Sequence, residues 1–314
     1  HKEYRRQRQM CIRDRLLIAG SEVGTVPINE ANCNEKGALG PGQLIAVDLA
    51  DGKLYHDEEI KNKLADAHPF GEWTTKVKEL DTKLSKVQEK QLYFGENLRK
   101  RQIAAGYTIE EIEQILVPMA EDGKETLASM GDDTPSAVLS ERYRPLSHYF
   151  RQNFSQVTNP PIDSLREFRV MSLKTRFGNL RNVLDEGSNQ TEILALESPF
   201  VGNSQWEELI KNFKADVINL DCTFAKSAGK ETLQTQLDRI RKEAEDAVRS
   251  GAGHIVLTDQ NIDESRVAMP MILATSAVHS HLTRKGLRTF CSINVRSSEC
   301  CLLYTSPSPR DVEE

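Results

Sequence analysis

Three side chains with reactive or ligating atoms directly follow predicted strands in the second half of the chain. Asp221 and Cys222 come after the apolar run 216–220, and Asp259 comes after the run 254–258. A thiol and two carboxylates placed in this way could form the site of an independent α/β enzyme with a cysteine nucleophile. The sequence identifies no base for Cys222 and therefore favours a buried, inert thiol. The enzyme reading stays open as an alternative.

Two other residue pairs could bind a metal ion. Asp132 and Asp133 could bind a divalent cation, but Gly-Asp-Asp is commonly a turn and no further ligands can be identified. His279 and His281 are two positions apart on a predicted helix, so they point to different faces and a shared metal is disfavoured. Neither glycine-rich stretch of the second half has the position and spacing of a phosphate-binding loop. We predict no catalytic, cofactor-binding or metal-binding residue in this chain.

Strands and helices alternate regularly in the second half. Predicted strands cover 193–196, 216–220, 254–258 and 289–295, and predicted helices cover 206–213 with Ser204 as cap, 231–249 ending near Gly251, and 271–284. Strands separated by helices of this length form βαβ crossovers and a parallel sheet covered on both faces. Ligands of such sheets bind at the carboxyl ends of the strands. The predicted fold class is α/β, preceded by a helical region and a small β-rich piece of a truncated domain.

The first half is organised differently. Residues 16–73 are expected to be β-rich and then briefly helical, with Asp51-Gly52 as a hairpin turn and Asp57 as a helix cap. This region has too little apolar surface to fold as a domain by itself. Residues 74–106 are rich in Lys, Glu, Gln and Leu and predict a polar helical connector. Thr108 and Glu111 have the spacing of a capping box that opens the next helix.

Residues 157–163 read VTNPPID. Pro160 and Pro161 fix two φ angles and remove two backbone donors, and Pro160 disfavours helical geometry at Asn159. The residues before this segment look helical, and Asp163 or Ser164 can cap a helix after it. Local physics therefore predicts a rigid corner between two helices.

The two ends of the chain are expected to be translated sequencing adapters. Residues 5–15 and 301–311 are what the two ends of a transposase-type adapter pair would encode, so 1–15 and 300–314 are set aside as artefacts. The first fifteen residues carry a net charge of +4 and the last fifteen −2, so their removal changes the net charge from −6 to −8. An acidic chain argues against nucleic acid as the main partner. Reads that continue a native frame through Met10 or Tyr304 would contradict the adapter interpretation.

The remaining composition indicates a cytoplasmic protein. Cys33, Cys222 and Cys291 are far apart and have no paired spacing for zinc or for a disulfide framework, which favours a reducing compartment. The sequence has no apolar run long enough to span a membrane, and we expect no membrane partner.

A series of motifs in a fixed order resembles the central domain of the glutamate synthase large subunit. These motifs are Lys124-Glu125, MGDDTPSAVLS at 130–140, RPL at 144–146, FSQVTNPPID at 154–163, VMSL at 170–173, AVH at 277–279 and GLRT at 286–289. Upstream, Ser21 to Gly24, Lys36-Gly37, Leu39, Pro41-Gly42 and Val47-Asp48 resemble the end of a class II amidotransferase domain. The resemblance covers essentially all of 16–299. It implies an amidotransferase end at 16–73, the connector at 74–106 and a central domain at 107–299.

The resemblance also implies a function. Such enzymes hydrolyse glutamine, pass ammonia through an internal tunnel, and convert 2-oxoglutarate to glutamate on an FMN barrel with a 3Fe-4S cluster. Electrons come from NAD(P)H through a small partner subunit or from ferredoxin, and we expect the NADPH type. The residues for this chemistry lie outside 16–299, in other domains of the same chain, so the segment is expected to be inert alone. A stand-alone α/β scaffold or interaction module is the other alternative.

The same resemblance assigns a role to the VTNPPID segment. The family's tunnel constriction is similar to Thr-Asn-Pro-Pro-Ile, which makes Thr158, Asn159 and Ile162 candidate tunnel-lining residues. Pro160 and Pro161 would hold their backbone in place.

Overall fold

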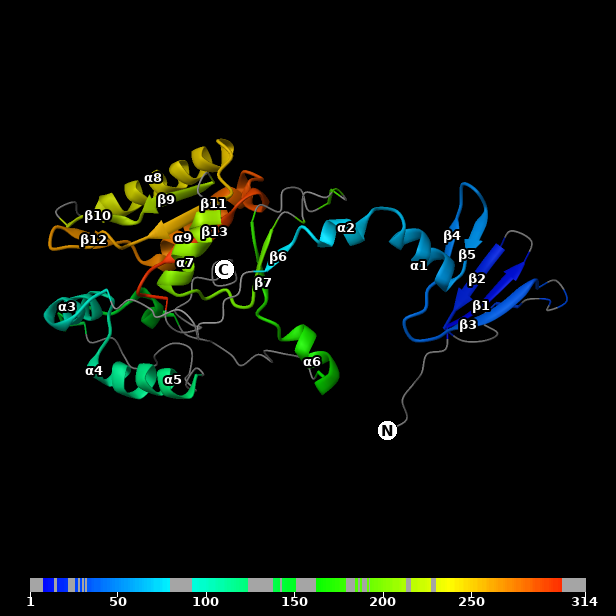
Figure 1. The fold of residues 1–314 in the computed structure, drawn as a ribbon, viewed down its shortest axis with the longest axis horizontal. Coiled ribbons are helices and arrows are strands. Elements are labelled where there is room, and N and C mark those ends of the chain that lie inside the picture. The colour runs from blue at the N-terminus through cyan, green and yellow to red at the C-terminus, as the bar shows by residue number, and fades with distance from the viewer. Residues whose placement is uncertain are drawn as a thin grey trace. The chain divides into compact units, whose positions relative to one another are not determined.

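The fold is given by a computed structural model of residues 1–314 (Figure 1). The structure describes residues 8–13, 16–21, 26–27, 29, 31, 33–79, 92–123, 138–141, 143–150, 162–178, 184–185, 187, 191, 193–212, 216–226 and 230–300. The chain divides into two compact units, His1–Thr75 and Lys76–Glu314.

The first unit is built from two small antiparallel sheets. In one, the strand order is β2-β1-β3, and the strands are β1 (Arg8–Arg13), β2 (Leu16–Gly20) and β3 (Glu35–Leu39). The other is the hairpin of β4 (Ala46–Asp48) and β5 (Lys53–Tyr55), which confirms the Asp-Gly turn prediction. Gly52 has a φ of 62° there, in the left-handed region that glycine adopts without strain.

The helices of the first unit correct two expectations. Helix α1 (Asp57–Ala65) begins one residue earlier than predicted, with His56 and not Asp57 at the N-cap position. The Asp57 carboxylate instead accepts hydrogen bonds from the Leu44 backbone N–H and from Lys61 Nζ, both at 2.9 Å. Cys33 is disulfide-bonded, so the expectation of unpaired cysteines was wrong at this position. A short helix, α2 (Phe70–Thr74), follows, and none of the described residues up to this point is fully buried.

The second unit contains the predicted parallel sheet. Three strands, β9 (Val217–Asp221), β11 (His254–Thr258) and β13 (Ser292–Arg296), pair in the order β13-β11-β9, and both pairings are parallel. The crossovers between them are α8 (Lys230–Arg249) and α9 (Met271–Arg284), close to the predicted bounds. The α/β fold class is therefore confirmed. Strand β13 has a neighbour on one side only among the described strands.

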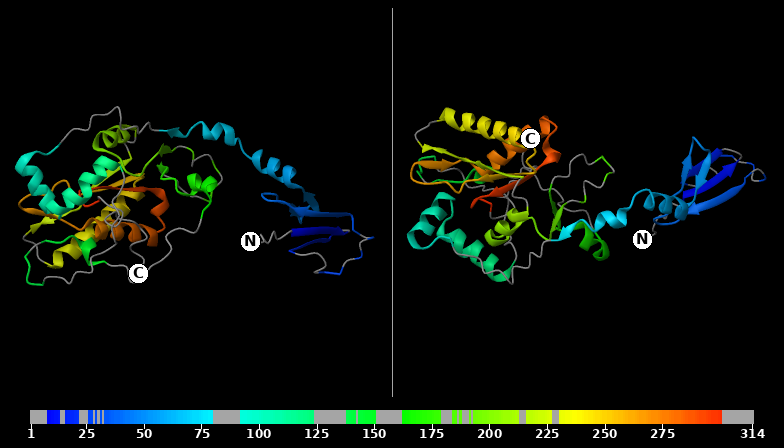
Figure 2. Two further views of the ribbon diagram at one scale, coloured as in Figure 1. Left: turned by 90° about the horizontal axis from the view of Figure 1, so that it is seen from below. Right: turned by 45° about the horizontal axis from the view of Figure 1, so that its top comes forward.

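Both faces of this sheet are covered (Figures 1 and 2). On one face, α8 and α9 pack against the sheet through a core that includes Ile240, Ile255 and Leu282, all fully buried. On the opposite face, Val256 packs with Trp206 and other residues of a second core. The alternation of Ile255 and Val256 between the two cores follows from the two-residue period of a strand.

The second core corrects the prediction for the first strand of this region. Strand β8 (Leu194–Leu196) does not pair with the described strands of the parallel sheet. It pairs with β6 (Lys78–Glu79) and β7 (Thr175–Phe177) in a separate mixed sheet. Helix α7 (Asn203–Asn212) packs beside it and begins before Ser204, which is therefore not its cap. At this helix start, Gln205 Oε1 accepts a hydrogen bond from the Gly202 N–H at 2.9 Å.

Two further strands form a ribbon at the end of the parallel sheet. Strand β10 (Thr223–Ala225) follows β9 closely, and β12 (Arg266–Ala268) precedes α9. The two pair antiparallel, with Phe224 opposite Val267. A short 3-10 turn, η7 (Arg288–Phe290), occupies the start of the predicted last strand, so that strand begins three residues later than expected.

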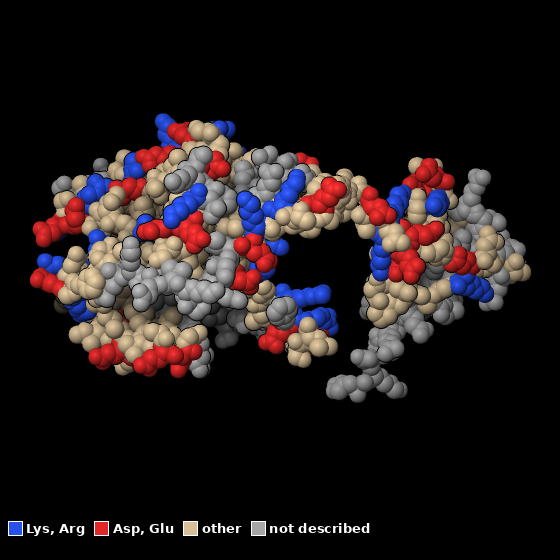
Figure 3. Space-filling model, viewed as in Figure 1, with Lys and Arg blue, Asp and Glu red and all other residues tan. Residues whose placement is uncertain are grey.

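A helical region precedes the sheet in the chain. It comprises α3 (Gly95–Ala104), α4 (Ile109–Glu111), the π turn η3 (Ile112–Leu116) and α5 (Val117–Asp122). The capping box of Thr108 and Glu111 is confirmed. Pro118 lacks an N–H for the Gln114 carbonyl, which explains the wider turn at this place. Acidic side chains gather over α4 and α5 on the face shown in Figure 3.

The connector at 74–106 and the VTNPPID segment at 157–163 lie only partly within the described residues. The helical prediction for 74–106 is correct for α3 but wrong at Lys78–Glu79, which form β6. A 3-10 turn, η4 (Leu146–Tyr149), precedes the VTNPPID segment, and α6 (Ser164–Val170) follows it. Asp163 caps α6 as predicted, because its carboxylate accepts from the N–H groups of Leu165 and Arg166.

Candidate functional site

Asp221, at the carboxyl end of β9, is held in an ion-paired cluster. Its Oδ2 is 3.1 Å from Arg266 Nη2 and accepts a hydrogen bond from Asn261 Nδ2, while its Oδ1 accepts from the Thr223 hydroxyl at 2.7 Å. Burial alone would raise the pKa of Asp221, but these hydrogen bonds and the Arg266 charge hold it below its usual value. Asp221 therefore fixes β12 against β9, and its acceptor atoms are already occupied.

Cys222 has none of the features of a nucleophile. Its side chain is fully buried, and burial raises the pKa of the thiol to about 12. The hydrogen-bonding neighbour of Sγ is the Leu220 carbonyl oxygen at 3.7 Å, which is not a base. The predicted burial of this thiol is confirmed, and its burial and raised pKa disfavour the alternative of a cysteine nucleophile at this position.

Asp259, at the end of β11, belongs to a second polar network. Its Oδ2 accepts a hydrogen bond from the Ser297 hydroxyl at 2.5 Å, and Ser297 Oγ accepts from the Glu299 N–H at 3.0 Å. Glu299 Oε2 in turn accepts from the N–H of Met271, the first residue of α9, at 2.8 Å. Burial raises the pKa values of both carboxyl groups, and the Asp259 charge adds to the effect on Glu299. Sequence reasoning thus placed Asp259 correctly but missed Ser297 and Glu299.

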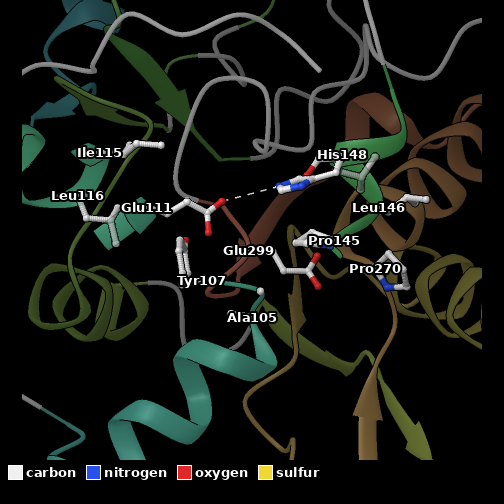
Figure 4. A pocket seen from close by; sticks show the side chains of 13 residues that line it. Ala105, Tyr107, Glu111, Ile115, Leu116, Pro145, Leu146, His148, Pro270 and Glu299 are labelled. Carbon is white, nitrogen blue, oxygen red and sulfur yellow. Dashed lines mark ion pairs between the residues drawn. The ribbon is translucent and has the colours of Figure 1, made fainter. Parts of the chain in front are cut away.

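A small cavity of about 40 Å³ lies beside this network (Figure 4). The residues that line it come from the α3–α4 turn, α4, η3, η4, the start of α9 and Glu299. Ten of these lining residues are labelled in the figure. Glu299 lies between Tyr107 on one side and Pro145 and Pro270 on the other. The cavity therefore lies where the helical region meets the carboxyl end of the parallel sheet.

The cavity holds one weak ion pair and one polar atom without a hydrogen bond. His148 Nε2 is 3.9 Å from Glu111 Oε1, and both side chains are about three-quarters buried. Within the described residues, His148 Nδ1 is buried without a hydrogen-bond partner. The volume has room for a few water molecules, at roughly 10–15 Å³ each, and the lining offers both donors and acceptors.

The two histidines considered as metal ligands, His279 and His281, face different partners. His281 Nε2 pairs with Glu245 of α8 at 2.7 Å, whereas His279 Nδ1 accepts from Arg288 Nε at 3.0 Å, so the two rings face different elements as predicted. Across the described part of the chain, no three His, Cys, Asp or Glu side chains are grouped to hold a metal. Asp132, Asp133, Thr158, Asn159, Pro160 and Pro161 lie outside the described residues, and Ile162 is partly buried.

Comparison with known protein families shows the family of this chain. The family model of the glutamate synthase central domain matches residues 100–305, and that of class II glutamine amidotransferases matches residues 3–73. The chain belongs to the glutamate synthase family. Both matched ranges extend into the terminal stretches predicted to be adapters, and the adapter interpretation stays a prediction.

Curated members of the glutamate synthase family align along nearly the whole chain. The NADPH glutamate synthase large chain of Azospirillum brasilense is 54% identical over 91% of this chain and 19% of its own length. The ferredoxin-dependent chloroplastic enzyme of Spinacia oleracea is 37% identical over 91% of this chain and 18% of its own. The NADPH large chain of Bacillus subtilis is 36% identical over 93% of this chain and 19% of its own. The chain therefore spans about a fifth of the length of these relatives.

In this glutamate synthase segment, no pattern in the sequence pointed to the cavity. Tyr107, Glu111, Pro145, His148 and Glu299 are brought together by tertiary packing and not by spacing within one element. The RPL motif did contain Pro145, but the resemblance attached no role to it. In the described part of the chain, no helix has the length and apolar character needed to cross a membrane.

Proposed function

We propose that this chain is the link between the glutaminase and synthase parts of a glutamate synthase large chain. The reaction of the whole enzyme is glutamine plus 2-oxoglutarate plus reductant to two glutamate. The observation that carries this proposal is the order of the two family matches, with an amidotransferase match before a central-domain match on one chain. The chain contributes structure and part of an ammonia-tunnel wall, and it is inert alone.

Thr158, Asn159 and Ile162 are the tunnel-lining residues in this proposal. Pro160 and Pro161 support them by restricting the backbone. The proposal is supported by the capped helix α6, which starts at Ser164 and fixes the chain immediately after Ile162. A wall of this kind has to keep a small neutral molecule away from water.

FMN and a 3Fe-4S cluster belong to the parent enzyme and not to this segment. The thiols of Cys222 and Cys291 are buried in the core of α8 and α9, and no metal-binding group forms among the described residues. These residues do not fit an iron–sulfur cluster, which needs several cysteine thiolates together. No step of the reaction is therefore assigned to side chains of this chain.

The remaining assignments concern the electron donor and the partners. We propose the NADPH type, in which a small subunit delivers electrons, because the Azospirillum brasilense relative, an NADPH enzyme by name, is 54% identical, whereas the ferredoxin-dependent relative of Spinacia oleracea is 37% identical. The other partners are the amidotransferase and FMN domains of the same polypeptide. A cytoplasmic location fits this reaction.

The proposal is tested by sequencing the gene on both sides of this segment and assaying the reaction products of the full-length protein. The full-length protein is expected to form glutamate from glutamine and 2-oxoglutarate with NADPH. Residues 16–299 alone are expected to hydrolyse no glutamine and to form no glutamate. Either activity in the segment, or flanking sequence that encodes unrelated domains, would overturn the proposal.

A further inference from the structure

Three consecutive residues after β13 are each bonded to a different element. The Ser297 hydroxyl donates to Asp259 at the end of β11 at 2.5 Å. The Ser298 carbonyl oxygen accepts from the Tyr107 hydroxyl in the α3–α4 turn at 2.8 Å. The Glu299 carboxylate accepts from the Met271 N–H at the start of α9 at 2.8 Å. The backbone at 297–299 is thus tied to the sheet, to the helical region and to a crossover helix at once.

Two of these bonds, from Ser297 to Asp259 and from the Met271 N–H to Glu299, are partly buried, whereas the bond from Tyr107 to Ser298 is exposed. Asp259 is only 8% exposed, and Glu299 lines the cavity between Tyr107 and Pro270 (Figure 4). The charged and titratable groups around the pair are Arg101, Glu111, Tyr143 and His148. Hydrogen bonds in surroundings of low dielectric are stronger than in water, and a buried donor left without an acceptor is costly.

We propose that residues 297–299 form a clasp that sets the direction in which the polypeptide leaves the parallel sheet. In the full-length enzyme this direction positions the part of the chain that follows, which under the proposed function includes the synthase site. The clasp therefore rests on the proposed function for its effect on coupling. Its residues are positioning residues, because they act on the path of the chain through the bonds to Asp259, Tyr107 and Met271. Small errors in the placement of reacting parts can lower a rate by about 100-fold.

The test uses the full-length enzyme with substitutions that each remove one bond of the clasp. Tyr107→Phe removes the hydroxyl bound to Ser298, and Glu299→Ala removes the acceptor of the Met271 N–H. Glu299→Gln is the conservative variant, because its amide oxygen can still accept that bond. Tyr93→Phe is the matched control, because it removes a tyrosine hydroxyl bonded to Gln260 at 3.2 Å and removes none of the three bonds of the clasp.

Two measurements distinguish a failure of the clasp proposal from a failure of the proposed function. The first is the rate of limited proteolysis immediately after Glu299, which requires no activity. The second is the amount of glutamate formed from 2-oxoglutarate per glutamine hydrolysed, measured with the glutaminase kcat and KM. We expect Tyr107→Phe and Glu299→Ala to raise cleavage and to lower the coupling ratio by about 2- to 10-fold, the range of one lost hydrogen bond. The glutaminase kcat should stay unchanged, and Glu299→Gln and Tyr93→Phe should resemble the unsubstituted enzyme.

Two outcomes would overturn the clasp. One is unchanged cleavage and coupling in both Tyr107→Phe and Glu299→Ala. The other is increased cleavage with an unchanged coupling ratio, which would show a local bond without a positioning role. An unsubstituted full-length protein that forms no glutamate from glutamine would instead refute the proposed function. In that case the cleavage rates still count for or against the clasp.

Discussion

Glu299 and Asp259 are two buried carboxyl groups whose pKa values burial raises. In the folded state they keep their protons to a higher pH than in the unfolded chain. The free energy of unfolding therefore falls as pH rises from the ordinary carboxyl range through the folded-state pKa values. These two acids therefore stabilise the fold most at low pH. Asp221, whose pKa is lowered, contributes its stability at higher pH and loses it as pH falls.

This linkage predicts a pH-dependent effect of Glu299→Gln. The amide keeps an acceptor for the Met271 N–H but cannot ionise, so the variant should lose less stability than the original chain as pH rises above the ordinary carboxyl range, from about pH 4 upward. Urea unfolding at a series of pH values measures this difference. Glu121→Gln, at an exposed position of α5, is the control. Parallel stability curves for Glu299→Gln and the original chain would contradict the prediction.

Removing the acceptor altogether has a different expected result. Glu299→Ala leaves the Met271 N–H without its carboxylate, and an unsatisfied buried donor costs about 1–3 kcal/mol. The variant should therefore be less stable than Glu299→Gln at every pH in the same series. Equal stabilities of the two variants would mean that water replaces the carboxylate without cost.

Among the elements, the turn between α3 and α4 depends on one glycine. Gly106 has a φ of 88°, and an added Cβ would lie 2.4 Å from Pro145 Cγ. Alanine there would combine backbone strain with a clash against η4, and each contribution is typically about 1–3 kcal/mol. Gly123 is a matched control, because its φ is 64° and an added Cβ meets nothing within 4 Å.

The expected result is that Gly106→Ala destabilises the chain clearly more than Gly123→Ala. Urea midpoints of the two variants, compared with the original chain, measure the difference. Equal losses of stability in the two variants would show that Pro145 can move away from the added Cβ at no cost in free energy.

The alternating strands and helices could be predicted because each carries its own apolar period. Helix α9 was predicted at its observed bounds, and Asp163 was a correct cap because its carboxylate acts on the next few residues. The caps at α1 and α7 were wrong because several polar residues stand at each start, and tertiary contacts decide which one is used. Asp57, for example, is recruited by Leu44, thirteen positions away.

The pairing partners of strand 193–196 and the cavity could not be predicted for a related reason. The partners of β8 are β6 and β7, and β6 lies more than a hundred residues earlier in the chain. The cavity likewise joins Tyr107, His148 and Glu299, whose separations carry no local signal. Long-range pairing of this kind depends on the packing of the whole second unit, whereas propensity and spacing describe only neighbouring residues.

For the whole molecule, the tunnel proposal predicts an uncoupled enzyme. Replacing both Pro160 and Pro161 with alanine in the full-length protein frees the backbone next to Thr158 and Asn159, because alanine has no ring to fix φ. Glutamine hydrolysis should continue while glutamate formation from it falls several-fold. Added ammonium salt should restore part of the glutamate formation. Unchanged coupling would remove the tunnel role of this segment.

Strand β13 lies at the border of its sheet, with β11 as its neighbour among the described strands. The outward N–H and C=O groups of such a strand are a template for any other extended chain. A preparation of the segment without its flanking domains therefore risks strand-to-strand aggregation through Ser292–Arg296. Poor solubility of the isolated segment would report on this open border and not on a failure of the α/β core to fold.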